Sequence, residues 1–334
     1  MKVTSVLAVG VLLFGALSSE AVASPAARPG AGSAHGAAAS PSSAHSSQSG
    51  MIVFSSGFIL NGPDTDNPSQ VFSVRPDGSH VRQLTHVPAD KQAGAPDLST
   101  DGRRIAYVSD VDGNFAVWAM SADGSHQHRL FGRTNYDYFQ PRWSPDGRRL
   151  VATQCDNTLG FTDQCTIILA DSDGSHRRTL VGDHVFSGDA SFSPDGEWIA
   201  FDSDRAGYQS VVWKVPSEGG RPIRLTKPSF EGFWPNWSPD GRHLVVNNNC
   251  CSPGNANVYT MRSDGSQLRR LTRGANAGLP SYSPDGSRIV FSSNQLSADP
   301  DLNDLFVMRA DGTHQHRIVQ GQPNAVGGDW EREK

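Results

Sequence analysis

The side chains that offer chemistry most openly in this sequence are aspartates and asparagines in short clusters. The densest cluster is Asp299, Asp301, Asn303 and Asp304. Carboxylate and amide oxygens are the ligands that Ca²⁺ prefers, so this cluster is a candidate calcium site. It does not complete a twelve-residue calcium loop with its bidentate glutamate, and Asp and Asn also stabilise ordinary turns. We therefore expect no cofactor, with calcium at this cluster as the alternative.

Histidine pairs and repeated serines are the next candidates. His126 and His128 have near-copies at His314 and His316, and each pair could place two imidazoles on one face of a strand. Duplication at an exposed edge explains these pairs without a metal, so we expect no metal there. The sequence contains neither a Gly-x-Ser-x-Gly nucleophile motif nor a glycine-rich phosphate loop. We accordingly expect no catalytic residues.

Four cysteines fall into two pairs. Cys155 and Cys165 flank a short loop, and in an exported protein such a pair is expected to form a disulfide across that loop. Cys250 and Cys251 are adjacent in the sequence. They could form a vicinal disulfide, remain free or bridge to another chain, and we favour the vicinal bond.

The N-terminus predicts export. Lys2 supplies a positive charge, residues 6–17 are apolar, and Ala21-Val22-Ala23 provides a small-residue cleavage signal, so residues 1–23 are interpreted as a signal peptide. The apolar run is too short to cross a bilayer, which predicts a secreted or periplasmic protein without membrane insertion. Residues 24–50 are nearly all Ala, Ser, Gly and Pro, and predict a disordered linker. The formal net charge of −5 indicates no nucleic acid partner.

Internal repetition indicates the elements that position these groups. Five segments share a hairpin motif, Ser-Pro-Asp-Gly in four copies and Ser-Thr-Asp-Gly in one, whose aspartates are Asp101, Asp146, Asp195, Asp240 and Asp285. Their spacing, in the mid-forties, is typical of one four-stranded propeller blade. Proline presets the second position of the turn and glycine takes the left-handed one, which closes a hairpin between two strands.

A second motif alternates with the first. It is an apolar strand that ends in Asp-Gly or Glu-Gly, and its six glycines are Gly78, Gly124, Gly174, Gly219, Gly265 and Gly312. The predicted fold is therefore an all-β, six-bladed β-propeller over residues 51–331, with four strands in each blade and a monomeric state. The first unit begins at what is already a second strand. Residues 328–331, with Trp330, are predicted to supply its innermost strand, because this pairing closes the ring and removes an exposed sheet edge.

These motifs resemble the WD40-like, Pro-Asp-containing repeats of the TolB-type β-propeller family. The shared pattern is Pro-x-aromatic-Ser-Pro-Asp-Gly followed by an Ile-Ala-Phe-type strand, and Pro141, Pro235 and Pro280 supply its first proline. The resemblance covers the whole predicted propeller and departs from the pattern at Leu98 and Thr100. It implies the propeller fold. TolB itself carries an additional N-terminal α/β domain, where this chain has its Ala- and Ser-rich linker.

Binding is expected at one mouth of the central channel, in the loops that connect blades. Aromatic residues in loops on a rigid scaffold suit ligand recognition. The candidate binding residues are Lys91, Tyr136, Asp137, Tyr138, His184, Phe186, Phe230, Glu231, Asn276 and Asn324. Phe139 and Trp234 are equally well explained by packing between blades.

The predicted function is a non-catalytic scaffold that binds a protein, a peptide or a glycan. The alternative is a propeller enzyme, a polysaccharide lyase or hydrolase, with His184, Asp137, Asp189 and Glu231 around the channel. That alternative requires these groups to converge within hydrogen-bond reach of one substrate.

Overall fold

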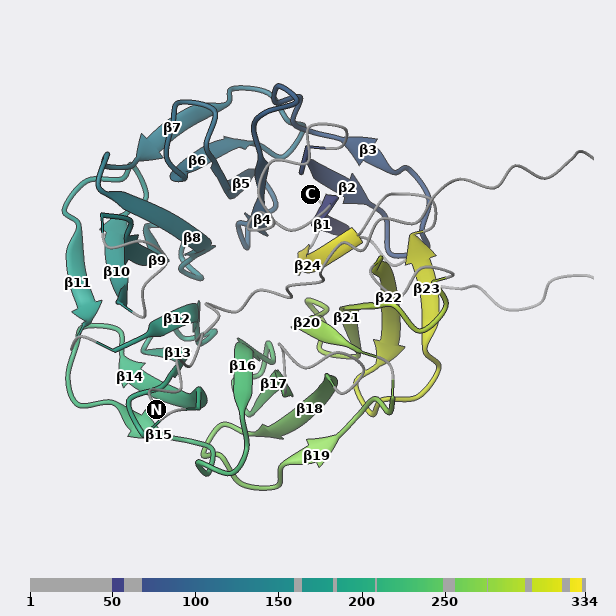
Figure 1. The fold of residues 1–334 in the computed structure, drawn as a ribbon. Helices are drawn as coiled ribbons and strands as arrows, with labels where there is room; N and C mark the ends of the chain where they lie inside the picture. Colours follow the sequence, from purple (N-terminus) through teal and green to yellow (C-terminus); the bar gives the residue numbers. More distant parts are fainter. Residues whose placement is uncertain are drawn as a thin grey trace, which may run out of the picture.

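Six four-stranded antiparallel sheets stand in a ring, as Figure 1 shows. The computed structural model describes residues 50–56, 68–158, 164–182, 185–207, 209–248, 256–274, 276–297, 302–319 and 325–331. The six-bladed propeller predicted from the repeats is confirmed. We number the blades 1 to 6, beginning with the blade that contains β1.

Each blade has an innermost, a second, a third and an outermost strand. The innermost strands of blades 1 to 6 are β24 (Ala325–Glu331), β4 (Ala93–Leu98), β8 (Tyr136–Trp143), β12 (Ser187–Phe192), β16 (Gly232–Trp237) and β20 (Gly278–Tyr282). The second strands are β1 (Met51–Ser56), β5 (Arg104–Ser109), β9 (Arg149–Asp156), β13 (Trp198–Ser203), β17 (His243–Asn248) and β21 (Arg288–Ser293). The third strands are β2 (Val71–Val74), β6 (Ala116–Ser121), β10 (Cys165–Asp171), β14 (Val211–Pro216), β18 (Asn257–Arg262) and β22 (Asp304–Arg309). The outermost strands are β3 (Arg82–Gln83), β7 (His128–Phe131), β11 (Arg178–Val181), β15 (Ile223–Arg224), β19 (Arg269–Arg270) and β23 (His316–Val319).

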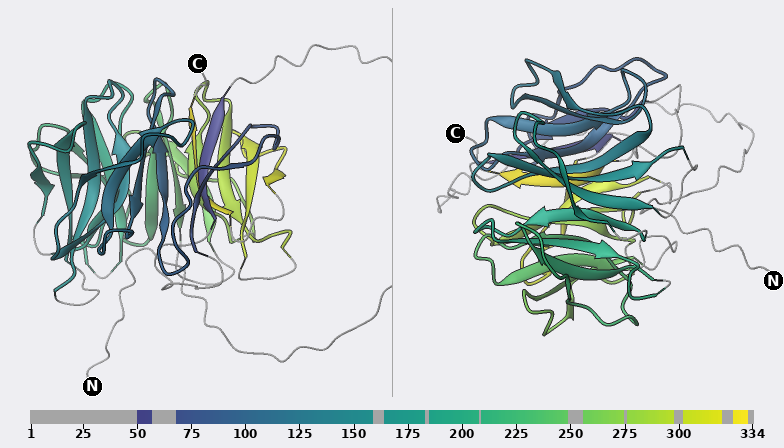
Figure 2. Two further views of the ribbon diagram at one scale, coloured as in Figure 1. Left: turned by 90° about the horizontal axis from the view of Figure 1, so that it is seen from above. Right: turned by 90° about the vertical axis from the view of Figure 1, so that its left-hand side faces the viewer.

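The strands run between two ends of the ring, which Figure 2 shows from the side. Tight turns join the innermost to the second strand and the third to the outermost strand at one end, which we call the hairpin end. The connections from the second to the third strand, and from one blade to the next, lie at the opposite end because the strands are antiparallel. We call this the loop end.

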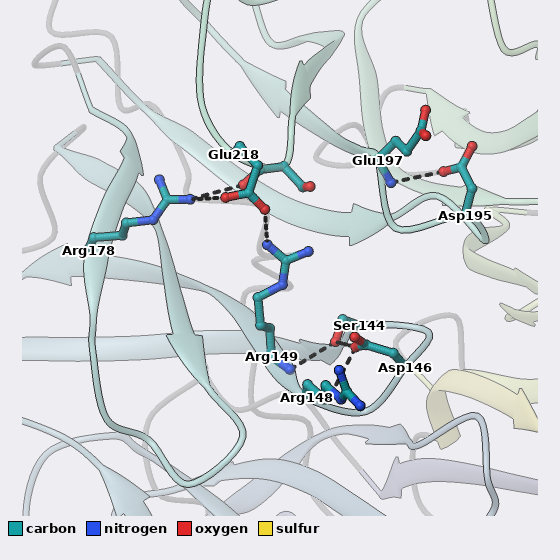
Figure 3. A network of polar contacts seen from close by, with 9 residues as sticks. Ser144, Asp146, Arg148, Arg149, Arg178, Asp195, Glu197 and Glu218 are labelled. Carbon is teal, nitrogen blue, oxygen red and sulfur yellow. Dashed lines mark hydrogen bonds and ion pairs between the residues drawn. The ribbon is translucent and has the colours of Figure 1, made fainter.

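The Ser-Pro-Asp-Gly hairpins have the turn chemistry that the sequence predicts. In blade 3 the Ser144 hydroxyl donates to Asp146 Oδ1 at 2.6 Å and accepts the backbone N–H of Arg149 at 2.9 Å, as Figure 3 shows. Gly147 has a φ of 66°, the left-handed region that favours glycine. Arg149 also reaches Glu218 of blade 4 at 2.6 Å, so the hairpins link neighbouring blades.

The ring is closed by the C-terminal strand, as predicted. β24 pairs with β1, with Ile52 opposite Trp330 and Val53 opposite Asp329. Figure 1 shows the yellow β24 beside the purple β1. Trp330 is buried, like the ring that precedes the hairpin serine in blades 3 to 6. The two ends of the propeller sequence therefore complete one blade.

The hydrophobic core is divided among the seams between neighbouring blades. Side chains of a strand alternate between its two faces, so each blade contributes to two seams. In the seam between blades 6 and 1, Ile52, Phe54 and Trp330 pack against Val290 and Leu305. Each of the other five seams has a cluster of the same kind. The predicted packing of Phe139 and Trp234 is confirmed, because both side chains are buried.

The predicted disulfide between Cys155 and Cys165 is confirmed. The two residues are opposite one another on β9 and β10, with Cα atoms 4.2 Å apart. Cys250 and Cys251, and residues 1–49 with the predicted signal peptide, lie outside the described residues. Within the described ranges there is no helix long and apolar enough to cross a membrane.

Candidate binding site: the two ends of the central channel

A bulge in every innermost strand separates the two ends of the channel. The residues at the bulges have left-handed backbone: Ala95, Gln140, Asp189, Trp234, Leu279 and Gly327. Left-handed φ is uncommon in residues other than glycine. Because it recurs in all six blades, this conformation belongs to the architecture. The bulge changes the direction of each innermost strand within the channel wall.

At the loop end, four of the ten predicted binding residues fall on one equivalent position, three residues before the bulge. The described residues at this position, from blade 2 to blade 6, are Gln92, Asp137, Phe186, Glu231 and Asn276. We call them the rim position. Lys91 precedes the first of them and is half-buried. His184 and Asn324 are predicted site residues for which the structure gives no description.

The rim residues differ in how far they reach solvent. Asp137 is half-buried and accepts the backbone N–H of Phe115 at 3.0 Å, while burial raises the pKa of its carboxyl group. Burial also raises the pKa of Glu231, which is half-buried. Phe186 and Asn276 are buried. The rim therefore offers two partly accessible acidic groups on separate blades.

The aromatic candidates beside the rim are partly structural. Tyr136 is half-buried and packs on the seam between blades 2 and 3, and Phe230 lies edge-on to Tyr259 with ring centroids 5.0 Å apart. Tyr138 is fully buried and lies edge-on to Phe131, so its ring belongs to the core. Tyr136 and Phe230 are the two aromatic candidates that keep an exposed part.

A buried acid pair lies in the wall of blade 4. Ser210 donates to Asp202 Oδ2 at 2.7 Å. Burial raises the pKa of Asp189 to about 6. Burial, and next the charge of Asp189, raise the pKa of Asp202 well above its ordinary value. Both effects disfavour ionisation of the two carboxyl groups at the same time.

The acids that the enzyme alternative invokes lie on separate blades. Asp137, Asp189 and Glu231 come from blades 3, 4 and 5, and the described hydrogen bonds join no two of them. The structure describes only part of the candidate calcium cluster. Asp304 pairs with Arg317 at 2.9 Å, and Asp299 and Asp301 lie outside the described residues.

At the hairpin end, the six innermost strands surround a cavity of about 660 Å³. Its walls repeat a position directly before the ring that packs in the seam. From blade 1 to blade 6 the residues at this position are Asp329, Asp97, Arg142, Ser191, Asn236 and Ser281. We call them the channel ring. Prolines of the hairpins line the outer part of the cavity. A volume of this size suits a small ligand or a side chain with part of its backbone.

Charge in the channel ring is confined to blades 1, 2 and 3. Arg142 Nη1 lies 2.8 Å from Asp97 Oδ1 and 3.4 Å from Asp329 Oδ1. The carboxylates also fasten the next blade, because Asp97 accepts the N–H of Trp143 at 2.7 Å and Asp329 that of Leu98 at 2.9 Å. Burial, and next the charge of Asp329, raise the pKa of Asp97 to about 7 against the opposing effect of Arg142.

Sequence reasoning missed the channel ring. Its signal was present in the aligned repeats, where the residue before the seam ring changes in charge from one copy to the next while the residue after it is an aromatic ring in five of the six copies. Asp97, Arg142 and Asp329 are charged in three consecutive blades. That run becomes visible once Trp330 is aligned with the other seam rings.

The fold, the repeats and the closing strand agree with comparisons to known proteins. The model of the TolB β-propeller domain matches residues 130–333. The chain belongs to this TolB β-propeller family. It is 31% identical over 208 residues to uncharacterized protein Atu1656 of Agrobacterium fabrum, covering 60% of this chain and 64% of that protein. It is 25% identical to the Tol-Pal system protein TolB of Francisella tularensis subsp. mediasiatica, covering 69% of this chain and 51% of that protein.

The chain spans about half to two-thirds of the length of the curated relatives it matches. The solved structure of TolB from Acinetobacter baumannii superposes with a TM-score of 0.70 at 20% identity, over 85% of this chain and 67% of that one. Oligogalacturonate lyase in complex with manganese superposes with a TM-score of 0.56 at 15% identity, over 83% of this chain and 82% of that one. Both structural likenesses show the fold alone.

Proposed function

We propose that this TolB-type propeller is an exported, non-catalytic scaffold that binds a protein or peptide partner at the loop end of its channel. The observation that carries the proposal is the loop end, where Lys91, Asp137 and Glu231 keep partly exposed charged groups on separate blades of a rigid ring. Scaffolds of this kind place variable recognition groups on fixed strands. The Tol-Pal system name of one group of relatives supports a role in protein contacts at the cell envelope.

The sharpest test changes polar rim residues. Lys91 and Glu231 are half-buried, whereas truncating Tyr136 or Phe230 would also remove packing from a seam. We expect Lys91→Ala and Glu231→Gln together to weaken a partner at least tenfold while the melting temperature stays close to wild type. The partner would first be isolated by crosslinking in the cell envelope and identified by mass spectrometry, and its affinity then measured with the purified protein.

A matched control lies at the other end of the propeller. Glu218, between β14 and β15, is exposed, and Glu218→Gln removes the same charge as Glu231→Gln. The control should bind the partner as wild type does. Equal affinity for wild type and the Lys91→Ala, Glu231→Gln double variant would reject the loop end as the binding surface. If a purified glycan competes with the partner for the rim, the ligand of the loop end is a glycan and not a protein.

The enzyme alternative has one observation in its favour, which is that burial raises the pKa values of Asp189 and Asp202 in the channel wall. A general acid needs a pKa near the working pH, and the pKa of Asp189 is raised to about 6. Asp189→Asn would abolish any turnover that depends on the pair. Incubation with polygalacturonate and other acidic polysaccharides, followed by measurement of unsaturated products, tests this alternative directly.

A further inference from the structure

We propose that the hairpin-end cavity binds the side chain of a lysine or arginine from a partner segment, with its cationic group between Asp97, Asp329 and Glu331. This site lies at the end of the channel opposite to the rim. It does not depend on the proposed function of the loop end.

The charges of the lining favour a cation. Asp97, Asp329 and Glu331 line the cavity, and Arg142 is the one cation among the described residues that do so. Arg142 uses a single nitrogen, Nη1, for both of its carboxylate contacts. Asp97 and Asp329 therefore share one guanidinium group inside a confined space that Glu331 also lines, where charges are weakly screened by water. One further positive charge would bring the lining closer to neutrality.

The bonding of Asp329 leaves room for this charge. The side chain is nine-tenths buried, and its Oδ2 accepts the N–H of Leu98 at 2.9 Å. Its Oδ1 has Arg142 Nη1 and Ser281 Oγ as neighbours, both at 3.4 Å. Charge-assisted hydrogen bonds are usually about 2.7–2.9 Å long. Asp329 Oδ1 is thus an acceptor whose described donors are both distant.

Apolar and neutral polar side chains complete the site. Trp143, Phe192, Trp237, Tyr282 and Trp330 line the cavity and can pack against the methylene groups of a basic side chain. Asn236 lines the same cavity and carries an amide group. A ligand that combines a cation with an amide could therefore contact both Asp329 and Asn236. A basic residue within a peptide has both groups.

The shape of the channel ring places this ligand on one side. The charged residues Asp329, Asp97 and Arg142 belong to blades 1 to 3, and small or neutral polar residues occupy the ring in blades 4 to 6. The space therefore lies over the wall formed by Ser191, Asn236 and Ser281. An extended segment could enter past the hairpin prolines with its basic side chain directed at blades 1 and 2.

The test uses small probes and the whole protein. N-acetyl-lysine N-methylamide is titrated by calorimetry or by NMR, with N-acetyl-norleucine N-methylamide as the neutral counterpart of similar shape. We expect the lysine probe to bind at least tenfold more tightly. Asp329→Asn should weaken it at least tenfold and Glu331→Gln severalfold. Asp264→Asn removes the same charge from an exposed hairpin outside the lining and should change the affinity less than twofold.

Each outcome decides the proposal. Equal binding of the two probes, or wild-type affinity in both Asp329→Asn and Glu331→Gln, would overturn it. If Asp329→Asn does not fold, as judged by near-ultraviolet circular dichroism, Glu331→Gln alone decides. Butylamine provides the cation without a carbonyl group and should bind severalfold more weakly than the lysine probe. If butylamine binds as tightly as the lysine probe, the proposal that the ligand is a peptide is overturned, and the ligand is a free amine. Loop-end variants such as Glu231→Gln should leave every result unchanged.

Discussion

Replacing Asp97 with Asn should change how the stability of the propeller depends on pH. The carboxyl group of Asp97 is buried between Asp329 and Arg142, and burial raises its pKa from 3.8 to about 7. Its proton is therefore held more tightly in the folded state than in the unfolded chain. Stability from this group is fully present below the unfolded pKa, and is lost as the pH rises through the folded pKa.

The magnitude follows from the two pKa values. With 3.8 unfolded and about 7 folded, this one group lowers the free energy of unfolding by about 2–3 kcal/mol between pH 5 and pH 8. Asn at this position cannot ionise and removes the dependence. Its amide oxygen can still accept the N–H of Trp143, which now bonds to the Asp97 carboxylate at 2.7 Å. The variant should lose part of its contact with Arg142 at every pH.

Urea unfolding of both proteins at pH 5, 6, 7 and 8 measures the effect. The difference in free energy of unfolding between wild type and Asp97→Asn should move by about 2–3 kcal/mol in favour of the variant across this range. Asp189 and Asp202 also have raised pKa values, but they titrate in both proteins and cancel in the difference. Parallel stability curves for the two proteins would refute the assignment of this proton to the Asp97 site.

Three further predictions address the closing strand, the disulfide and calcium. Deleting residues 326–334 removes the edge pairing of β1 and the buried Trp330. Truncating a buried tryptophan alone costs about 3–5 kcal/mol, so the deletion should lower the free energy of unfolding in urea by more than that. A deletion variant as stable as wild type would reject ring closure by β24. Cys165→Ser should lower stability by about 2–3 kcal/mol, and wild type under reducing conditions should unfold at the same urea concentration as the variant. Calcium at millimolar concentration should leave the melting temperature unchanged, because Asp304 is already paired with Arg317, and a rise that a chelator reverses would show a site.

The blades could be predicted because each one repeats the same local physics. The Ser144 hairpin is determined by four adjacent residues, and its copies repeat that bonding at each blade. The closing strand was predictable for a related reason, since a β1 without a partner would leave an exposed edge. Trp330 then identified the strand because it takes the place of the ring in the other copies.

The candidate site was less predictable because it depends on where the innermost strands turn. The repeats do not reveal the left-handed bulges, and without them Tyr138 could be assigned to the rim although its ring lies in the core. The contact of Arg142 with Asp329 joins residues far apart in the sequence. This contact depends on ring closure, so a comparison of adjacent repeats does not predict it.

Asp329 connects ring closure with the proposed cation site. It lies on the terminal strand β24, fastens that strand to blade 2 through the N–H of Leu98, and faces Arg142 of blade 3. A basic ligand that binds the folded ring and not the unfolded chain must raise stability by mass action. Its positive charge must also favour the ionised form of Asp97, which faces Asp329 and Arg142 in a cavity that Glu331 also lines. A saturating concentration of the lysine probe should therefore raise the melting temperature more at pH 8 than at pH 5, and should do so in wild type more than in Asp329→Asn.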